Sequence, residues 1–363
     1  AKRTAADLAR DAAEMGGSIF SSAGTDKTVV GGEVLSEFDS KLIEVIGEIL
    51  RSPKFEADDF ETIKANKLRE ITISRGQAST LAWEKFRQTL FPGHAYADPY
   101  PKESVLNKMT LADAKSYYDS QYGAARTHLY IVGQFDRSRV KKAVDAAFAD
   151  WKKGPEMIRD VPEANAKRTL SVIDRPGAPQ STIYIGMPAI SPSADDYVKF
   201  EVMDALLGGS FGSRITSNIR EDKGYTYSPG SAIWSRYKVG VWYENADVTT
   251  EATGASIKEI LFEIDRLKEE KPSEQEMTGI KNYLIGVYVL QNSSRAGVLN
   301  MLETVNYNEL ERSFLDKYVQ MVSAVTAQDV SDMAKKYLDT NKMTIVVVGD
   351  RSKIDEQLKP YQP

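Results

Sequence analysis

The chain lacks cysteine altogether and has only two histidines, His94 and His128, among its 363 residues. Without cysteine, disulfides and thiolate metal sites are excluded, although the cellular compartment stays open. Two histidines are few for a hydrolase, because most hydrolytic metal sites and acid–base pairs use at least one. The sequence also lacks any run of about eighteen apolar residues, so no membrane span is expected.

Charge of one sign and phosphate-binding glycine motifs are absent as well. The net charge is −5, with acidic and basic residues mixed along the chain, so nucleic acid is not an expected partner. No G-x-G-x-x-G or phosphate-binding loop occurs, which leaves a nucleotide-binding fold without support. Apolar residues at 42% and charged residues at 27% are typical of a globular protein, and the length suggests about two domains.

An internal repeat runs through the chain, and residues 109–140 resemble residues 325–354. In each copy a threonine is expected to cap a helix with an aspartate at its third position, and an apolar strand then ends at a glycine. Upstream, the Ile63-Lys64 region matches the Ile280-Lys281 region in the same order. The matching positions, each 216 residues apart (326 − 110, for example), are Thr110 and Thr326, Asp113 and Asp329, and Gly133 and Gly349.

The repeat predicts an α+β fold with two tandem α/β-sandwich domains, each an antiparallel-rich sheet with helices on one side. We assign the first domain to residues 1–155, a polar linker to 156–168 and the second domain to 169–363. The second domain has strands and a helix between residues 169 and 209 whose counterparts would lie before Ala1. The first repeat is therefore expected to lack its N-terminal strands and helix, either because the chain is a fragment or because something else completes it.

The segment Asn218–Gly230, NIREDKGYTYSPG, places an arginine and a tyrosine seven positions apart, at Arg220 and Tyr227. A guanidinium and a phenol are hydrogen-bond donors at neutral pH, and such donors stabilise negative charge that develops on a substrate. The alternative is that Arg220 complements a helix C-terminus and Tyr227 is a plain strand residue. Similarly, Gly208-Gly209 can allow close backbone approach or simply cap a helix.

Three stretches, residues 2–61, 90–136 and 206–228, together resemble the insulinase/pitrilysin-type metallopeptidases, also called inverzincins. The resemblance covers nearly the whole chain in the family's order. It implies tandem α+β domains, four of which enclose a chamber in which peptides are cleaved with zinc. In that family a helix bearing His-x-x-Glu-His supplies two zinc ligands and a water-activating glutamate, and a downstream glutamate is the third ligand.

The resemblance does not extend to a zinc motif within this sequence. The helix expected around residues 201–209, EVMDALLGG, has no histidine. Glu70 falls near the third-ligand position, but Ile63 stands where the family usually has an acidic residue, so we favour a solvated charge. His94 matches a loop histidine of the family and is expected to be structural, and His128 is not expected to bind metal. We therefore predict no cofactor in this chain and expect zinc in a partner subunit.

Arg220 and Tyr227 match the family's arginine–tyrosine pair, which binds the substrate main chain and the developing oxyanion. Tyr225 occupies a position that is usually aliphatic, and Gly209 and Ser210 are expected to contribute to substrate binding. The leading hypothesis is the non-zinc subunit of a heterodimeric zinc endopeptidase, inactive alone, that acts on short or unfolded peptides with a homologous His-x-x-Glu-His subunit. The alternatives are a truncated copy of a chain with its own zinc motif and a non-catalytic scaffold, like the family's respiratory-complex core subunits.

Overall fold

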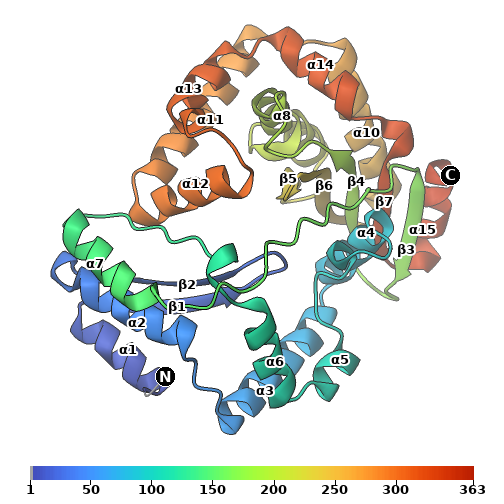
Figure 1. Cartoon of the computed structure of the whole chain (residues 1–363). Helices are drawn as coiled ribbons and strands as arrows, with labels where there is room; N and C mark the ends of the chain where they lie inside the picture. Colours follow the sequence, from blue (N-terminus) through green and yellow to red (C-terminus); the bar gives the residue numbers. More distant parts are fainter. Residues whose placement is uncertain (1–2) are drawn as a thin grey trace. The chain divides into compact units, whose positions relative to one another are not determined.

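The computed structural model describes residues 3–363, and contacts within the chain divide it into two compact units (Figure 1). The first unit comprises the residues up to Ile71 and Pro101–Arg159, and the second comprises Thr72–Tyr100 and Asp160–Pro363. The division after Arg159 falls inside the predicted linker, which has no helix or strand. The segment Thr72–Tyr100, which the sequence assigns to the first domain, makes its contacts in the second unit.

The first unit combines a two-stranded antiparallel sheet with helices. Helix α2 packs against both β2 and α7, and Gly47 of α2 lies close to Ala147 of α7, where a larger residue would crowd the interface. The elements are α1 (Ala5–Glu14), β1 (Ser18–Ala23), β2 (Thr28–Glu33), α2 (Asp39–Arg51), α3 (Ala57–Arg75, which continues into the second unit), α5 (Glu103–Lys108), α6 (Leu111–Gln121) and α7 (Arg137–Phe148).

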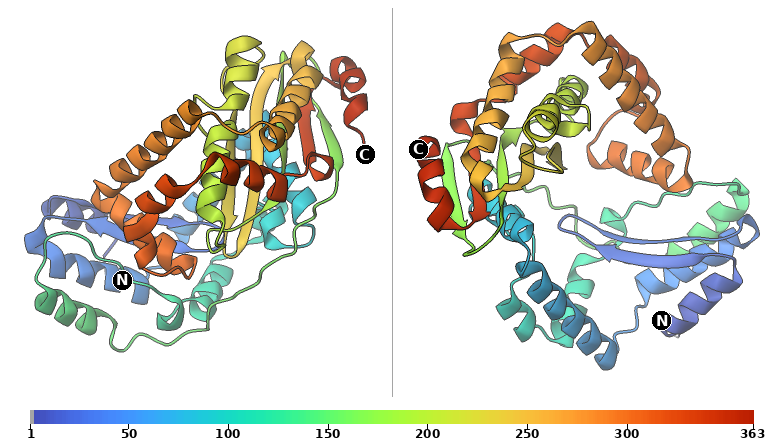
Figure 2. Two further views of the ribbon diagram at one scale, coloured as in Figure 1. Left: turned by 90° about the horizontal axis from the view of Figure 1, so that it is seen from above. Right: turned by 180° about the vertical axis from the view of Figure 1, so that it is seen from behind.

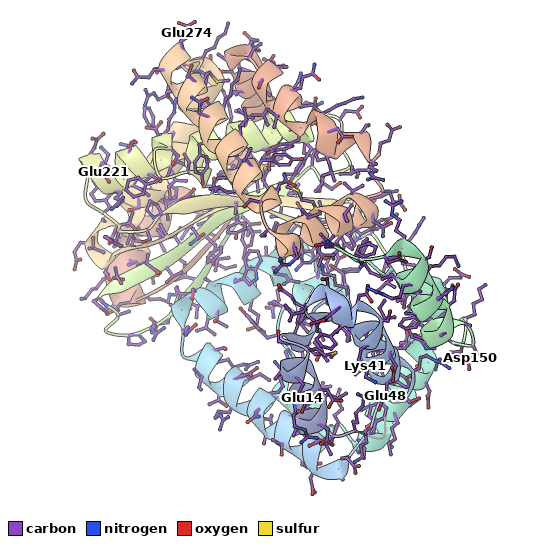
Figure 3. The ribbon with its side chains drawn as sticks, turned by 90° about the vertical axis from the view of Figure 1, so that its left-hand side faces the viewer. Glu14, Lys41, Glu48, Asp150, Glu221 and Glu274 are labelled. Atoms are coloured by element: carbon purple, nitrogen blue, oxygen red, sulfur yellow. The ribbon has the colours of Figure 1, made fainter. Side chains whose placement is uncertain are left out.

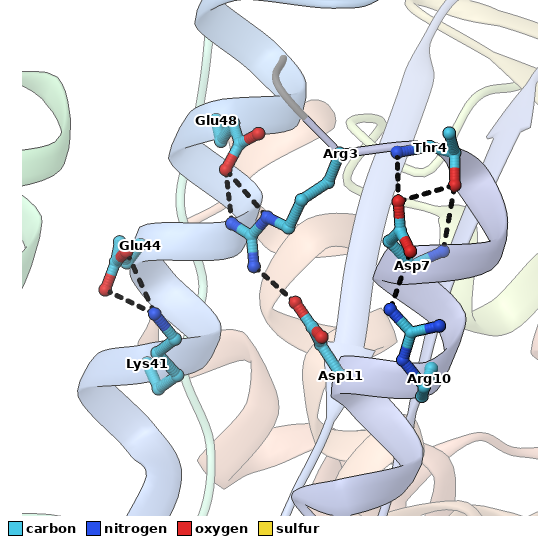
Figure 4. A network of polar contacts seen from close by, with 8 residues as sticks. All are labelled: Arg3, Thr4, Asp7, Arg10, Asp11, Lys41, Glu44 and Glu48. Atoms are coloured by element: carbon cyan, nitrogen blue, oxygen red, sulfur yellow. Dashed lines mark hydrogen bonds and ion pairs between the residues drawn. The ribbon is translucent and has the colours of Figure 1, made fainter.

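Arg3 ties α1 to α2, the helix that carries Lys41 and Glu48 (Figure 3). Its guanidinium donates to Asp11 at 2.5 Å and through Nε to Glu48 at 3.0 Å, as Figure 4 shows. Beside it, Thr4 and Asp7 form a capping box that satisfies the free amides at the start of α1. These contacts fix the first helix of the unit on its neighbour.

The predicted strand that ends at Gly133 does not form. Residues 127–132 have no regular secondary structure and belong to neither sheet of the part of the chain that the structure describes. The matching strand of the second unit, β7 (Thr344–Gly349), is hydrogen-bonded on both sides, by β3 (Thr169–Asp174) and β4 (Gln180–Ala189). Since the first unit has no described counterpart of β3 or β4, this segment has nothing to pair with.

The second unit is built on a five-stranded sheet of order β3-β7-β4-β6-β5 (Figure 2). The β3–β7 pair is parallel and the other pairs are antiparallel, so the predicted antiparallel-rich sheet is confirmed. The remaining elements of the unit are α4 (Ala78–Leu90), α8 (Tyr197–Asp204), α9 (Arg214–Thr216), β5 (Gly230–Arg236), β6 (Val239–Thr249), α10 (Thr253–Glu269), α11 (Glu274–Asn292), α12 (Arg295–Tyr307), α13 (Ser313–Ala324), α14 (Ala327–Tyr337) and α15 (Arg351–Leu358).

Helices cover both faces of this sheet. Alternate residues such as Ile183 and Ile185 of β4 face the main core with α8, α10 and α14. Helix α4 packs on the opposite face, where Trp83 and Phe86 contact Tyr184. The sheet therefore has the predicted helical layer on one side, and the segment Thr72–Tyr100 adds a helix on the other.

The internal repeat is confirmed at its helix caps. Thr110 with Asp113 and Thr326 with Asp329 form the same capping box at the starts of α6 and α14. The lysine of each repeat also makes an equivalent contact. Lys64 donates to the carbonyl of Asn107 at 3.0 Å, three residues before one cap, and Lys281 donates to the carbonyl of Ser323 at 2.8 Å, three residues before the other.

No helix among residues 3–363 combines the length and the apolar character needed to cross a membrane.

Candidate functional site

Arg220 lies on a π-helical turn, Ser217–Asp222, that continues directly from the short helix α9. Gly224, in the left-handed conformation with φ 63°, closes the turn. Its amide donates to the carbonyl of Arg220 at 3.1 Å, and the Tyr225 amide donates to that of Ile219 at 2.9 Å. The predicted helix end at this glycine is therefore present. π-Helical turns are uncommon and are frequent at functional sites.

The turn is anchored to α10 and to the core of the second unit. Asn218 donates through Nδ2 to Glu263 at 2.7 Å and to Glu259 at 3.1 Å, both on α10. Ile219 is fully buried. One turn earlier, Arg214 forms an ion pair with Glu276 of α11 at 2.8 Å. The backbone that carries Arg220 is thus held from three directions.

The Arg220 side chain lies between two aromatic rings. Its guanidinium carbon is 4.3 Å from the centre of the Phe211 ring and 5.2 Å from that of Tyr227. Both rings are largely exposed, Phe211 by 73% and Tyr227 by 80%, whereas the arginine side chain is only 21% exposed. Cation–π contacts of this kind orient a guanidinium and partly desolvate it. Arg220 and Tyr227, predicted from their spacing, are therefore adjacent in space.

Two donors of this group lack a regular hydrogen bond: Nη1 of Arg220, which is buried, and the hydroxyl of the exposed Tyr227. Nη1 of Arg220 lies 3.1 Å from a carboxylate oxygen of Glu221 but makes no hydrogen bond of regular geometry. Figure 3 labels Glu221. The Tyr227 hydroxyl has no hydrogen-bond partner among residues 3–363. Tyr227 also lies before β5 rather than within it. A donor that has no hydrogen-bond partner in the protein can donate to an acceptor of a ligand.

Tyr225 has a different environment from Tyr227, although it is only two residues away. It packs, partly buried, against the main core, and its carbonyl accepts from the amide of Thr249 at 3.1 Å. Between the two tyrosines, Thr226 donates through Oγ1 to the carbonyl of Asp247 at 2.7 Å. This alternation directs Tyr225 inward and leaves Tyr227 at the surface.

Gly208 and Gly209 belong to a second π-helical turn, Ala205–Gly209, which extends α8. A Cβ at Gly208 would lie 2.4 Å from Oε2 of Glu244, and one at Gly209 would lie 2.7 Å from Oδ2 of Asp204. Neither glycine has a positive φ, so neither is a left-handed helix cap. Close approach to two buried carboxyl groups is the reason for both glycines. Ser210 follows them and accepts, through its carbonyl, from the amide of Ser213 at 3.1 Å.

Sequence reasoning missed three carboxyl groups in this region, the buried ones of Asp204 and Glu244 and the partly buried one of Glu201. Burial raises the pKa of Glu201 to about 7, although a hydrogen bond from Tyr318 opposes the rise. Burial likewise raises the pKa of Asp204 to about 6. Burial and the nearby Asp204 charge raise the pKa of Glu244 well above its usual range. Acidic residues inside the apolar runs FEVMDALL and VWYENADV were the available signal.

The residues considered for metal binding are separate in the structure. Glu70 is an exposed residue of α3 that pairs with Lys67 at 2.7 Å. His94 caps the turn Ala95–Ala97 by accepting, through Nδ1, from the Tyr96 amide at 3.1 Å, as expected of a structural histidine. His128 lies exposed in the unpaired segment 127–132. Within residues 3–363 no three His, Cys, Asp or Glu side chains are placed to hold a metal, so a catalytic zinc does not fit this chain.

Parts of this sequence are similar to a known family and to individual proteins. The family model described as Peptidase M16 inactive domain matches residues 108–284. The non-peptidase homolog YmxG of Helicobacter pylori is 24% identical, over 88% of this chain and 74% of that protein. An uncharacterized zinc protease of Rickettsia felis is also 24% identical, over 95% of this chain and 83% of that protein.

Among solved structures, the peptidase M16 inactive domain from Pseudomonas fluorescens has the same fold. It superimposes with a TM-score of 0.88 at 23% identity, over 96% of this chain and 84% of that one. The architecture therefore defines an α+β protein of the type found in inactive peptidase domains. The chain is thus similar, in residues 108–284 and in its fold, to the M16 family of insulinase/pitrilysin-type peptidases, as its resemblance implied.

Proposed function

We propose that this chain is the non-zinc subunit of a two-chain M16 peptidase and that it supplies Arg220 and Tyr227 as substrate donors. The observation that carries the proposal is the Phe211–Arg220–Tyr227 stack, in which an anchored guanidinium lies beside a phenol with a free hydroxyl. An arginine that only contacts solvent would not need an anchored backbone or aromatic rings against its guanidinium. The absence of a metal-ligand group among the described residues agrees with this division of roles.

The chemistry of the pair suits a peptide carbonyl. Arg220 carries a fixed positive charge, and Tyr227 is a neutral donor that lies within reach of the same guanidinium. Donors held in place before the reaction stabilise the negative charge of a tetrahedral intermediate without a reorganisation cost. Gly209 and Ser210, next to Phe211, offer backbone groups for an extended peptide. Short or unfolded peptides are the expected substrates, because an extended main chain can reach these groups.

Open strand edges in the first unit support a partner chain. Among the described residues β2 pairs only with β1, and residues 127–132 pair with none. Nearby apolar side chains such as Phe20, Leu35 and Leu129 are about half exposed. Unpaired edges and exposed apolar surface favour association. The proposed partner is a homologous subunit that bears His-x-x-Glu-His.

Co-expression tests this proposal. The chain should co-purify with a homologous His-x-x-Glu-His subunit, and the mixture should cleave a fluorogenic peptide that neither chain cleaves alone. Arg220→Ala in this chain should abolish most of that activity while the complex still forms. A soluble folded monomer at micromolar concentration, with no complex in sedimentation, would refute the assembly.

The name of the Helicobacter pylori relative, a non-peptidase homolog, favours a second candidate, a non-catalytic scaffold. A scaffold needs the fold and the interface but not the donors. The co-expression experiment also distinguishes the peptidase subunit from the scaffold. If the complex forms and hydrolysis is unchanged by Arg220→Ala, the scaffold is the correct function.

A further inference from the structure

Glu244 is a fully buried carboxyl group without a regular hydrogen bond. It lies on the central part of β6 with no exposed surface, and neither of its side-chain oxygens has a hydrogen-bond partner of good geometry among residues 3–363. The Gly230 amide offsets only part of the rise in its pKa. An ionised carboxylate in such a place is costly, because nothing replaces the water it loses.

Asp204 lies beside it and differs in its bonding. Its Oδ1 accepts hydrogen bonds from Ser231 at 2.5 Å and from the indole of Trp242 at 2.7 Å. Its charge is one of the causes that raise the pKa of Glu244. The two carboxyl groups therefore differ in the ease with which they ionise, and Asp204 is the one that carries charge first.

The other groups facing this pair are also acidic or neutral. Glu201 and Tyr197 of α8 lie near enough to Asp204 for its charge to raise their pKa. Tyr318 of α13 donates to Glu201 at 2.7 Å, and Tyr243 of β6 packs on the opposite face of the sheet. No lysine or arginine in the described chain forms an ion pair with Asp204 or Glu244. Because no cation neutralises the pair, a proton must do so.

We propose that Asp204 and Glu244 form a buried proton-binding site beneath the Gly208–Gly209 turn, and that the proton on Glu244 keeps this turn seated. The contact is direct, since a Cβ at Gly208 would lie only 2.4 Å from Oε2 of Glu244 and one at Gly209 only 2.7 Å from Oδ2 of Asp204. Loss of the proton leaves two negative charges in a dry site. The turn is the part that can move away and admit water.

The turn leads straight to the candidate site. Ser210 and Phe211 follow Gly209, and Phe211 stacks on Arg220 at 4.3 Å. Opening of the turn therefore releases one of the two rings that hold the guanidinium. The proton site is thus a pH-dependent control on the Phe211–Arg220 stack, and it exists whether or not the chain is part of a peptidase.

Trp242 reports on the charged partner directly, because its indole N–H donates to Asp204. In the full chain, the indole N–H resonance of Trp242, assigned with Trp242→Phe, should shift with an apparent pKa of about 6. Asp204→Asn should abolish this titration. A resonance that does not move between about pH 5 and about pH 8 overturns the assignment of Asp204.

Hydrogen exchange of residues 205–213 tests Glu244. Above about pH 6.5 the opening equilibrium should rise by about tenfold per pH unit beyond the intrinsic rate, because one proton is released on opening. Glu244→Gln, which cannot ionise, should remove this slope. Glu201→Gln is the matched control, since it removes another carboxyl group near Asp204, on α8, and should keep the slope.

Two outcomes overturn the proposal. One is a flat wild-type profile for residues 205–213, which needs no variant to observe. The other is a slope that is the same in wild type and Glu244→Gln, because the released proton then comes from another group.

Discussion

At the scale of single residues, Arg220 shows how the fold prepares a side chain for a ligand. Its backbone is anchored through Asn218, and its guanidinium is stacked between Phe211 and Tyr227. Each contact removes conformational freedom that a ligand would otherwise have to remove on binding. The sequence predicted the pairing of Arg220 and Tyr227 from a spacing of seven. It did not predict Phe211, because an aromatic residue in a glycine-rich turn gives no local signal of where its ring will lie.

The partly buried carboxyl of Glu201 predicts a pH dependence of stability. Its pKa is raised to about 7, so its neutral form is favoured in the folded state. The neutral carboxyl contributes its full share of stability at pH values below its pKa in the unfolded chain. This contribution is lost as pH rises through about 7, its pKa in the folded chain. The group should lower the unfolding free energy by about 3 kcal/mol between about pH 5 and about pH 8.

Urea unfolding at several pH values measures this effect. Glu201→Gln should reduce the pH slope, because the amide still accepts the hydrogen bond from Tyr318 without gaining a charge, while Asp204 and Glu244 keep their share of the slope. Glu274→Gln, at the exposed start of α11 (Figure 3), is the control and should leave the profile unchanged. Equal pH slopes in wild type and Glu201→Gln would show that this carboxyl is not responsible.

At the scale of elements, the two π-helical turns of the second unit place the candidate site. The turn Ala205–Gly209 rests on Asp204 and Glu244, and the turn Ser217–Asp222 carries Arg220. Helical periodicity in a sequence does not distinguish a π-helical turn from the end of an α-helix. Their local geometry was therefore beyond sequence reasoning, although the glycines that permit it were visible.

Gly208 offers a direct test of the packing at the first turn. Gly208→Ala would place a methyl 2.4 Å from Glu244 and 2.8 Å from the Cβ of Ser231, and should cost roughly 1–3 kcal/mol of stability. Gly212→Ala is the matched control, because a Cβ there meets no atom within 4 Å and its φ is not positive. Equal stability of the two variants, measured by thermal or urea unfolding, would show that the close approach at Gly208 does not constrain the turn.

Other elements show where the sequence was sufficient and where it was not. The capping boxes at Thr110 and Thr326 follow from local chemistry alone, so they could be predicted residue by residue. The strand expected to end at Gly133 could not, because a strand also needs neighbours that supply hydrogen bonds. Helix α4 lies within the predicted first domain, residues 1–155, but its aromatic side chains pack on the sheet of the second unit.

At the scale of the whole molecule, the chain has the M16 fold without a zinc-ligand group in its described residues. We therefore expect the purified chain to hold well under one zinc per molecule, since a catalytic zinc needs three protein ligands and an open position. Metal analysis after dialysis measures this. One tightly held zinc per isolated chain would mean that a site exists outside the groups considered above.

The central claim is that Arg220 and Tyr227 act on the substrate in an assembled peptidase. Tyr227→Phe removes one hydroxyl and keeps the ring that stacks on Arg220, so the fold should be unaffected. Loss of one oxyanion donor lowers turnover by about 100- to 1000-fold, roughly 3–4 kcal/mol. Tyr225→Phe is the matched control, because Tyr225 packs toward the core and should change little.

The decisive measurement is kcat and KM for a fluorogenic peptide, with the zinc-bearing partner at saturation and either Tyr227→Phe or Tyr225→Phe in this chain. The account predicts that Tyr227→Phe lowers kcat far more than it raises KM, while Tyr225→Phe matches wild type. Near-full turnover by Tyr227→Phe would contradict the assignment, and Arg220 and Tyr227 would then be parts of an ordinary helix end and the loop that follows it.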